Sequence, residues 1–221
     1  MTQEQQKRSA AQAALAYIEP RLSRKSIVGV GTGSTTNHFI DALATIRHKF
    51  DATVASSEAS AARLQKHDIP VLDLNAAAEI TVYVDGADEV NTAREMIKGA
   101  GGALTREKII AASALEFVCV VDESKVVEVL GNFPLPVEVI PMARGLTARA
   151  LRDLGGHPAW RENFLTDNGN IILDVHELVI SDPRAMEEAI NNIVGVVCNG
   201  VFAAQAASVV IVAGPSGIRQ F

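Results

Sequence analysis

The stretch "SIVGVGTGSTTNHF" (residues 26–39) decides the predicted fold. A short apolar run rich in β-branched residues ends in a glycine turn, and hydroxyl residues then lead into a helical pattern. A buried strand, a glycine turn and a helix in that order are typical of a βαβ unit. Working outward from this stretch, the same alternation of strand and helix recurs through the first 125 residues.

Further apolar runs predict the rest of a parallel sheet. We expect strands at 52–57, 69–74, 79–88 and 117–125, with helices between them, and a last strand at 207–214. β-Branched runs that alternate with helical patterns indicate parallel strands with helices on both faces. The predicted fold class is therefore α/β, a doubly wound and mostly parallel Rossmann-like sheet.

The pattern changes between about 131 and 204. The predicted order there is strand ("FPLPVEVIP"), helix, short strand ("HPAW"), strand, helix capped by Asp182 with Pro183 at its first position, and strand ("GVVCNGVF"). "NFLTDNGNIILDVH" (163–176) predicts a hairpin whose two arms flank residues 167–170. This order is that of a ferredoxin-like α+β unit. We therefore predict a Rossmann-like catalytic domain over 1–130 plus 205–221, interrupted by an α+β subdomain over 131–204.

Composition excludes several function classes. The 221 residues carry a net charge of −6, which argues against nucleic acid or an anionic membrane as a partner. The first 18 residues form an amphipathic pattern without the apolar centre of a signal peptide, so we expect a cytoplasmic protein. Cys119 and Cys198 lie in apolar runs and are predicted to be buried thiols, and no Cys/His spacing indicates zinc.

Polar loops follow most of the predicted strands, and in an open parallel sheet those loops meet at one edge. "GTGSTT" (31–36) is not a dinucleotide fingerprint, because the third glycine would fall at Ser34 or Thr36, and the P-loop lysine is missing. What remains is a glycine turn at a helix N-terminus, which suits one phosphate group. The alternative is a plain turn in which Ser34 or Thr35 caps the helix.

Two further segments carry candidate chemistry. "DGADEV" (85–90) has three possible interpretations: a solvated turn, a Mg²⁺ site, or an acid–base pair made by Asp85 and Asp88. "KGAGGALTREKII" (98–110) places Lys98 before a nearly bare loop and Glu107 on the apolar stripe of the following helix. A carboxylate against an apolar face suits a general base, and the lysine suits a developing oxyanion. The alternatives are a flexible turn and a surface acid that favours the helix dipole.

Taken together, five segments resemble the type A ribose-5-phosphate isomerases: "GVGTGST" (29–35), "VDGADEV" (84–90), "KGAGGALTREKI" (98–109), "GNFPLPVEVIPMA" (131–143) and "TDNGNIILDVH" (166–176). The resemblance spans nearly the whole chain. It implies interconversion of ribose 5-phosphate and ribulose 5-phosphate through a cis-enediolate, without metal or cofactor, in a homo-oligomer, and we expect a homodimer. The segment "AAQAAS" (203–208) departs from the Arg-Gly-Ala-Asp-like text usual in the family, and Ala100 replaces a common glycine.

The resemblance also implies the roles of single residues. It makes Glu107 the proton acceptor. From the chemistry of the reaction we expect Lys98 to stabilise the oxyanion and Asp85 with Asp88 to assist ring opening. The implied substrate-binding residues, for a pentose phosphate, are Thr32, Gly33, Ser34, Thr35, Asp85, Gly86, Ala87, Asp88, Lys98, Gly99, Ala100, Gly101 and Lys125.

Two other functions are alternatives to isomerisation. A sugar-phosphate sensor of a transcriptional regulator needs a DNA-binding helix-turn-helix, and only about 25 residues precede the first strand of this acidic chain. Such a sensor also has no use for Glu107. A nucleotide-dependent dehydrogenase is disfavoured by the failed glycine fingerprint.

Overall fold

A computed structural model describes residues 1–221, and the chain divides into two compact units. The first unit consists of Met1–Gly86, Arg106–Lys125 and Ala207–Phe221. The second consists of Ala87–Thr105 and Val126–Ala206. Each unit has a sheet and a hydrophobic core of its own.

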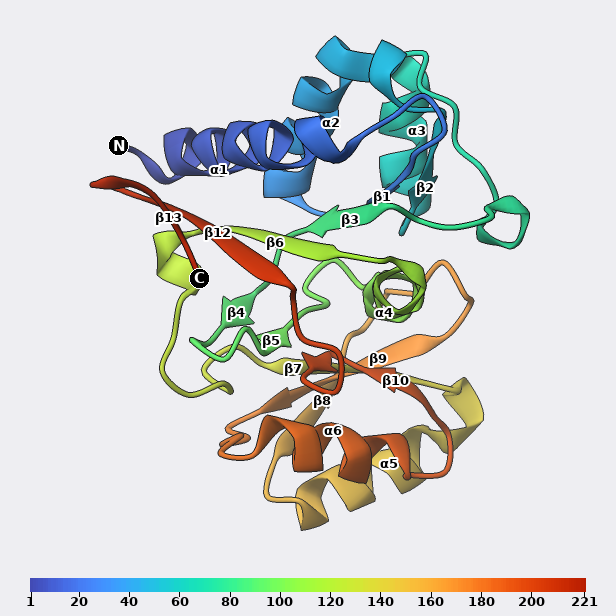
Figure 1. The fold of residues 1–221 in the computed structure, drawn as a ribbon. Helices are drawn as coiled ribbons and strands as arrows, with labels where there is room; N and C mark the ends of the chain where they lie inside the picture. The colour runs from blue at the N-terminus through green and yellow to red at the C-terminus, as the bar shows by residue number, and fades with distance from the viewer. The chain divides into compact units, whose positions relative to one another are not determined.

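The first unit contains a six-stranded sheet in the order β13-β12-β6-β3-β1-β2 (Figure 1). All neighbouring pairs are parallel except β12 with β13, an antiparallel strand that the sequence did not predict. Without β13, the strands in chain order follow the doubly wound arrangement 2-1-3-4-5, whose switch point lies between β1 and β3. The strands are β1 (Ile27–Val30), β2 (Ala52–Ala55), β3 (Val82–Asp85), β6 (Phe117–Asp122), β12 (Val209–Gly214) and β13 (Gly217–Gln220).

The two faces of this sheet have different coverings. Helices α1 and α2 pack against one face, where Val28, Val84 and Val118 join the main apolar core (Figure 1). Because side chains alternate along a strand, Tyr83 and Asp85 belong to the opposite face. The helices with residues in this unit are α1 (Gln3–Ile18), α2 (Ser34–Leu43), α3 (Glu58–Lys66) and α4 (Leu104–Ser113).

The predicted strand at 69–74 is wrong. Only Val71 forms a β-bridge, to Thr53, and the chain then enters a 3₁₀ turn at Leu74–Ala76. Pro70 has no N–H to donate to a ladder, and the Asp73 side chain accepts from the Asn75 N–H at 2.7 Å, which starts the turn.

The second unit contains the predicted ferredoxin-like arrangement. Its four-stranded sheet has the order β10-β7-β9-β8, and all its pairs are antiparallel. Helices α5 and α6 fall where the sequence placed them, and Asp182 caps α6 through a 3.0 Å bond from the Ala185 N–H. The elements are β7 (Leu135–Val139), α5 (Arg144–Asp153), β8 (His157–Trp160), β9 (Ile171–His176), α6 (Pro183–Asn191) and β10 (Val196–Asn199).

A second, three-stranded sheet in this unit was not predicted. It has the order β11-β5-β4 and consists of Val201–Phe202, Met96–Ile97 and Glu89–Val90. Strands of two residues leave no periodic signal in a sequence. Because β5 pairs with β11 and β4 pairs with β5, residues 87–105 belong to the second unit, which differs from the predicted domain boundaries.

The predicted hairpin at 163–176 is only partly right. Gly169 does adopt a positive φ of 78° in a turn closed by the Thr166 N–H and the Asn170 C=O at 2.9 Å. The first arm, however, is no strand, and β9 pairs instead with β8 and β7. The fully buried carboxylate of Glu138 explains the difference, because the side chains of Thr166, Asn168 and Asn170 turn inward and donate to it.

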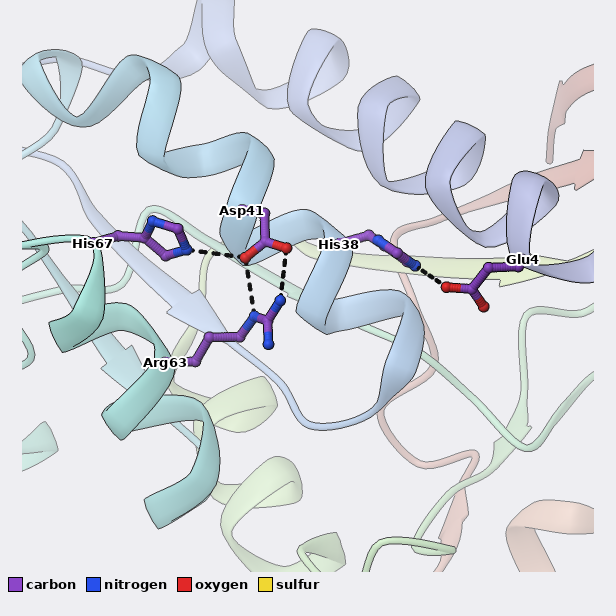
Figure 2. A network of polar contacts seen from close by, with 5 residues as sticks. All are labelled: Glu4, His38, Asp41, Arg63 and His67. Atoms are coloured by element: carbon purple, nitrogen blue, oxygen red, sulfur yellow. Dashed lines mark hydrogen bonds and ion pairs between the residues drawn. The ribbon is translucent and has the colours of Figure 1, made fainter.

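No helix of the chain is both long enough and apolar enough to span a bilayer. The helices of the first unit are joined to one another by a surface network of hydrogen bonds and ion pairs (Figure 2). Asp41 on α2 accepts from both Arg63, at 2.6 and 3.0 Å, and His67, at 2.9 Å, while His38 contacts Glu4 of α1 at 2.6 Å. These pairs tie α1 and α3 to α2.

The Asp41 contacts predict a small, pH-dependent contribution to stability. Hydrogen bonds from Arg63 and then His67 hold the pKa of Asp41 below its usual 3.8, against the opposing effect of burial. This stabilisation is present above pH 3.8 and is lost as the pH falls through the lowered folded pKa. Since Asp41 is 41% exposed, we expect Asp41→Asn to cost about 0.5–1 kcal/mol at pH 7.

Urea unfolding of the two proteins across pH checks this expectation. The difference between wild type and Asp41→Asn should shrink to zero in strong acid. Asp68→Asn is the control, because Asp68 is 88% exposed and its pair with Arg47 should contribute almost nothing. An Asp41→Asn effect that does not change with pH would contradict the ion-pair explanation.

Candidate active site

The carboxylate of Asp85, at the end of β3, is fully buried and accepts hydrogen bonds at both oxygens. Oδ1 accepts from the Thr32 N–H at 3.0 Å, the Thr36 hydroxyl at 3.2 Å and the Gly86 N–H at 2.7 Å. Oδ2 accepts from the Tyr83 hydroxyl at 2.5 Å. Asp85, the last residue of β3, thereby fixes the turn that follows the neighbouring strand β1.

Gly31 leaves the space that the Asp85 carboxyl group occupies. A Cβ atom at Gly31 would lie 1.8 Å from Asp85 Cγ, so no other residue fits beside that carboxylate. Helix α2 then begins at Ser34 with Gly33, at φ 131°, as its N-cap and without a capping side chain. The alternative in which Ser34 or Thr35 caps the helix is therefore wrong. A helix N-terminus without a side-chain cap directs its first N–H groups outward, which suits an anion.

The Thr32 side chain lies among serines from the next strand–helix connection. Its hydroxyl is 2.8 Å from both Ser56 Oγ and Ser57 Oγ, and Ser60 donates to the Gly31 carbonyl at 2.7 Å. The sequence marked this connection as polar but assigned it no role. These buried hydroxyls fix the backbone of the glycine turn.

Glu107 on α4 is buried, with 3% of the residue exposed, as its place on the apolar stripe predicted. Burial first, and then the negative charges of Asp85 and Glu107, raise the pKa of Tyr83 well above its usual 10. A Cβ atom at Gly29 would lie 2.9 Å from Ile110 Cγ2, so this glycine admits α4 close to the sheet. Glu107 is thus a buried acid that belongs to the Tyr83 and Asp85 face.

Lys125 ends a 3₁₀ turn, Glu123–Lys125, directly after β6. The buried Asp122 holds this turn, because its Oδ1 accepts from the Ser124 N–H at 3.1 Å. The lysine is half-buried and lies, like the glycine turn, after the carboxyl end of a strand of the same sheet. The Lys125 ammonium group is therefore placed where a cation could bind an anionic ligand.

The remaining predicted site residues belong to the second unit. Lys98, directly after β5, is 2% exposed, and its Nζ lies 5.5 Å from the centroid of the Phe202 ring. Asp88 Oδ2 accepts from the Ala100 N–H at 2.9 Å, while Gly99 has a φ of 117° that favours glycine. The loop after Lys98 is therefore a defined structure, and the flexible-turn alternative is wrong.

The predicted site residues thus fall into two local groups. In the first unit the structure brings Thr32, Asp85 and Gly86 together through hydrogen bonds. In the second it brings Asp88 and Ala100 together. Tyr83 and Thr36 were missed, although Tyr83 lies two residues before Asp85 on the same strand face. No three His, Cys, Asp or Glu side chains are grouped so that they could hold a metal ion.

Comparisons with known proteins show the family of the chain. The family described as ribose 5-phosphate isomerase A (phosphoriboisomerase A) matches residues 52–217. This chain belongs to that family. The ribose 5-phosphate isomerase A of Neisseria gonorrhoeae is similar over 100% of this chain and 97% of its own, with 46% identity and a TM-score of 0.95.

Two other solved structures are similar over 100% of this chain and 99% of their own. One is a D-ribose-5-phosphate isomerase in complex with phospho-erythronic acid, with 38% identity and a TM-score of 0.94. The other is the ribose 5-phosphate isomerase A of Methanocaldococcus jannaschii, with 37% identity and a TM-score of 0.92. The chain is accordingly an isomerase of pentose phosphate metabolism, and the predicted fold class is confirmed.

The contact between Gly31 and Asp85 generates a stability prediction. Gly31→Ala should destabilise the protein by about 1–3 kcal/mol, because the new methyl group forces the buried carboxyl away from its donors. Urea unfolding measures the change. Gly145→Ala is the matched control: it lies inside α5, and its Cβ would meet only Arg149 Nη1, at 3.6 Å. The control should be neutral or stabilising by up to about 1 kcal/mol, and an equal loss in both variants would contradict the Gly31 explanation.

Proposed function

We propose that this isomerase transfers a proton between C2 and C1 of the open-chain sugar phosphate with Glu107 as its single base. The observation that supports this most strongly is the burial of Glu107 on helix α4, which packs against the sheet beside Gly29 and Tyr83. A buried carboxylate is poorly solvated, which makes it a stronger base than an exposed one.

The proton transfers balance without a redox partner. Glu107 removes the proton from C2 of the aldehyde, the C–H electron pair forms the C1=C2 double bond, and the carbonyl oxygen becomes an oxyanion that Lys98 stabilises. A proton then moves from O2 to O1 of the cis-enediolate. Glu107 returns its proton to C1, and O2 becomes the carbonyl of the ketose.

Asp85 and Asp88 are the proposed carboxyl pair for opening the sugar ring. The burial of the two side chains suggests how the work is divided. Asp85 is fully buried and accepts from four donors, so we propose it as the fixed member. Asp88 is half-buried and thus more accessible to a sugar, so we propose it as the proton-exchanging member.

The 5-phosphate is proposed to bind at the glycine turn. Thr32–Thr35 with the first N–H groups of α2 supply hydrogen-bond donors, and Lys125 supplies positive charge. Gly86, Ala87 and the Lys98–Gly101 loop are the proposed contacts to the sugar. None of these steps calls for a metal or cofactor, and we propose that none is used.

We also propose that the protein is a cytoplasmic homodimer. The resemblance to the family implies a homo-oligomer, and the second unit carries exposed apolar side chains that would favour association. Met142 is 97% exposed and Val194 76%, and their chain segments are joined by the Ile140 N–H bond to the Gly195 carbonyl at 3.0 Å. The rival function, a sensor without catalysis, is not favoured, since a sensor has no use for a buried base.

Glu107→Gln tests the proposed base. The substitution keeps shape and hydrogen bonding but removes the basic oxygen, so we expect kcat for ribose 5-phosphate to fall by about 10²–10⁴ with EDTA present. Solvent deuterium should no longer enter the C1 and C2 positions. Binding of phospho-erythronic acid, measured by calorimetry, should survive because the phosphate contacts are unchanged.

Glu58→Gln is the control for this experiment. Glu58 is also a glutamate of a helix in the first unit, but its side chain is 77% exposed and pairs with Arg106 at 2.9 Å. It should retain wild-type turnover and exchange. A folded Glu107→Gln protein with near-normal isotope exchange would show that Glu107 is only a buried structural acid.

The phosphate contacts predict discrimination between substrates. The glycine turn and Lys125 are proposed to bind the phosphate and not the sugar. Since plain ribose would lose several charge-assisted hydrogen bonds, its kcat/KM should be at least about 10³-fold below that of ribose 5-phosphate. A coupled assay with both sugars measures the ratio. Comparable kcat/KM values for the two sugars would contradict the proposal that this turn binds the phosphate.

A further inference from the structure

Arg161, in the connection between β8 and β9, makes an unassigned set of contacts to the Lys98–Gly101 loop. Its Nη1 donates to the Ala100 carbonyl at 3.0 Å, and both Nη1 and Nη2 lie 3.4 Å from the Gly99 carbonyl. An arginine that binds two successive carbonyls of a loop restricts the loop's backbone directly.

The guanidinium group is itself held in place. Nε donates to Asp174 Oδ2 at 2.8 Å and Nη2 to Asp174 Oδ1 at 2.5 Å, a two-bond pair in which both side chains are about four-fifths buried. Paired in this way, a planar guanidinium has a fixed direction. Asp174 lies on β9, so the loop is tied to a strand of the four-stranded sheet.

Two further contacts limit the loop from other sides. The N–H of Ala100 donates to Asp88, so both polar groups of this residue are held, one by Asp88 and one by Arg161. Phe164 fills the space that Gly102 leaves, since a Cβ there would lie 2.2 Å from the Phe164 ring. The ring of Phe164 also lies 5.2 Å from the Arg161 guanidinium carbon.

We propose that Arg161 is a positioning residue for isomerisation: anchored by Asp174, it holds the Gly99 and Ala100 carbonyls and so fixes the loop that begins with Lys98. This inference rests on the proposed role of Lys98–Gly101 in substrate binding and oxyanion stabilisation. Small misplacements of catalytic groups cost much of their effect on rate. Arg161 thereby acts on turnover through Lys98 and the loop, without contact to the reacting atoms.

Arg161→Lys is the decisive variant, because it keeps the charge but cannot span Asp174 and both carbonyls. Steady-state kinetics should show kcat reduced about 10–100-fold, KM changed less than about threefold and a nearly unchanged melting temperature. Arg144→Lys is the matched control, the same substitution at an arginine of this unit that stacks on Trp160 at 4.4 Å. It should behave as wild type.

Asp174→Asn serves as a second variant, since it leaves Arg161 in place but removes its charged anchor. A kcat loss of at least about fivefold in Asp174→Asn supports the inference even if Arg161→Lys fails to fold. Wild-type turnover in folded Arg161→Lys overturns the inference and leaves the proposed function intact. If Arg161→Lys does not fold, wild-type turnover in Asp174→Asn has the same meaning. A wild-type protein that does not isomerise ribose 5-phosphate would overturn the proposed function and this inference with it.

Discussion

The contacts of the buried Asp85 carboxylate are the constraint on which the candidate site of the first unit depends. Burying a charged carboxylate is costly unless donors surround it. Here the donors come from the turn after β1, from α2, from the next peptide and from the strand itself. Two of these four bonds, from Thr32 and Thr36, also fix the glycine turn at the switch point of the sheet.

This arrangement explains the residue types around it. Gly31 must lack a side chain because the Asp85 carboxyl group occupies that space. Tyr83 lies fully buried two residues earlier, where the strand's alternation directs its hydroxyl to the same carboxylate. The second unit uses a comparable arrangement around the buried Glu138, whose donors determine the 166–170 turn. In both units a buried acid determines the path of a loop.

The sequence predicted the elements that have strong periodicity or turn chemistry. The run at 26–31, the cap at Asp182 and the inward direction of Glu107 could all be read from spacing alone. What it missed depends on distant partners. β4 and β5 pair with each other over two residues only, and β5 also pairs with β11, about a hundred residues later.

The site residues show the same division. Thr32, Asp85 and Lys98 could be proposed from the sequence because their motifs are local. Tyr83 and Arg161 were missed because their roles arise from contacts to other segments, and Arg161 reaches a loop some sixty residues earlier. Side chains that support a site carry little sequence signal unless the fold is already known.

The most direct test of the central claim is calorimetric binding of phospho-erythronic acid to Asp85→Asn. The Asn side chain would place its NH₂ group, a donor, against groups that also donate. If the Asp85 carboxylate fixes the glycine turn, the substitution should weaken binding by about 10–100-fold in a protein that remains folded, as expected for lost hydrogen bonds to a charged group. Wild-type affinity in folded Asp85→Asn, together with a large loss of turnover, would contradict the claim and leave Asp85 a purely chemical participant.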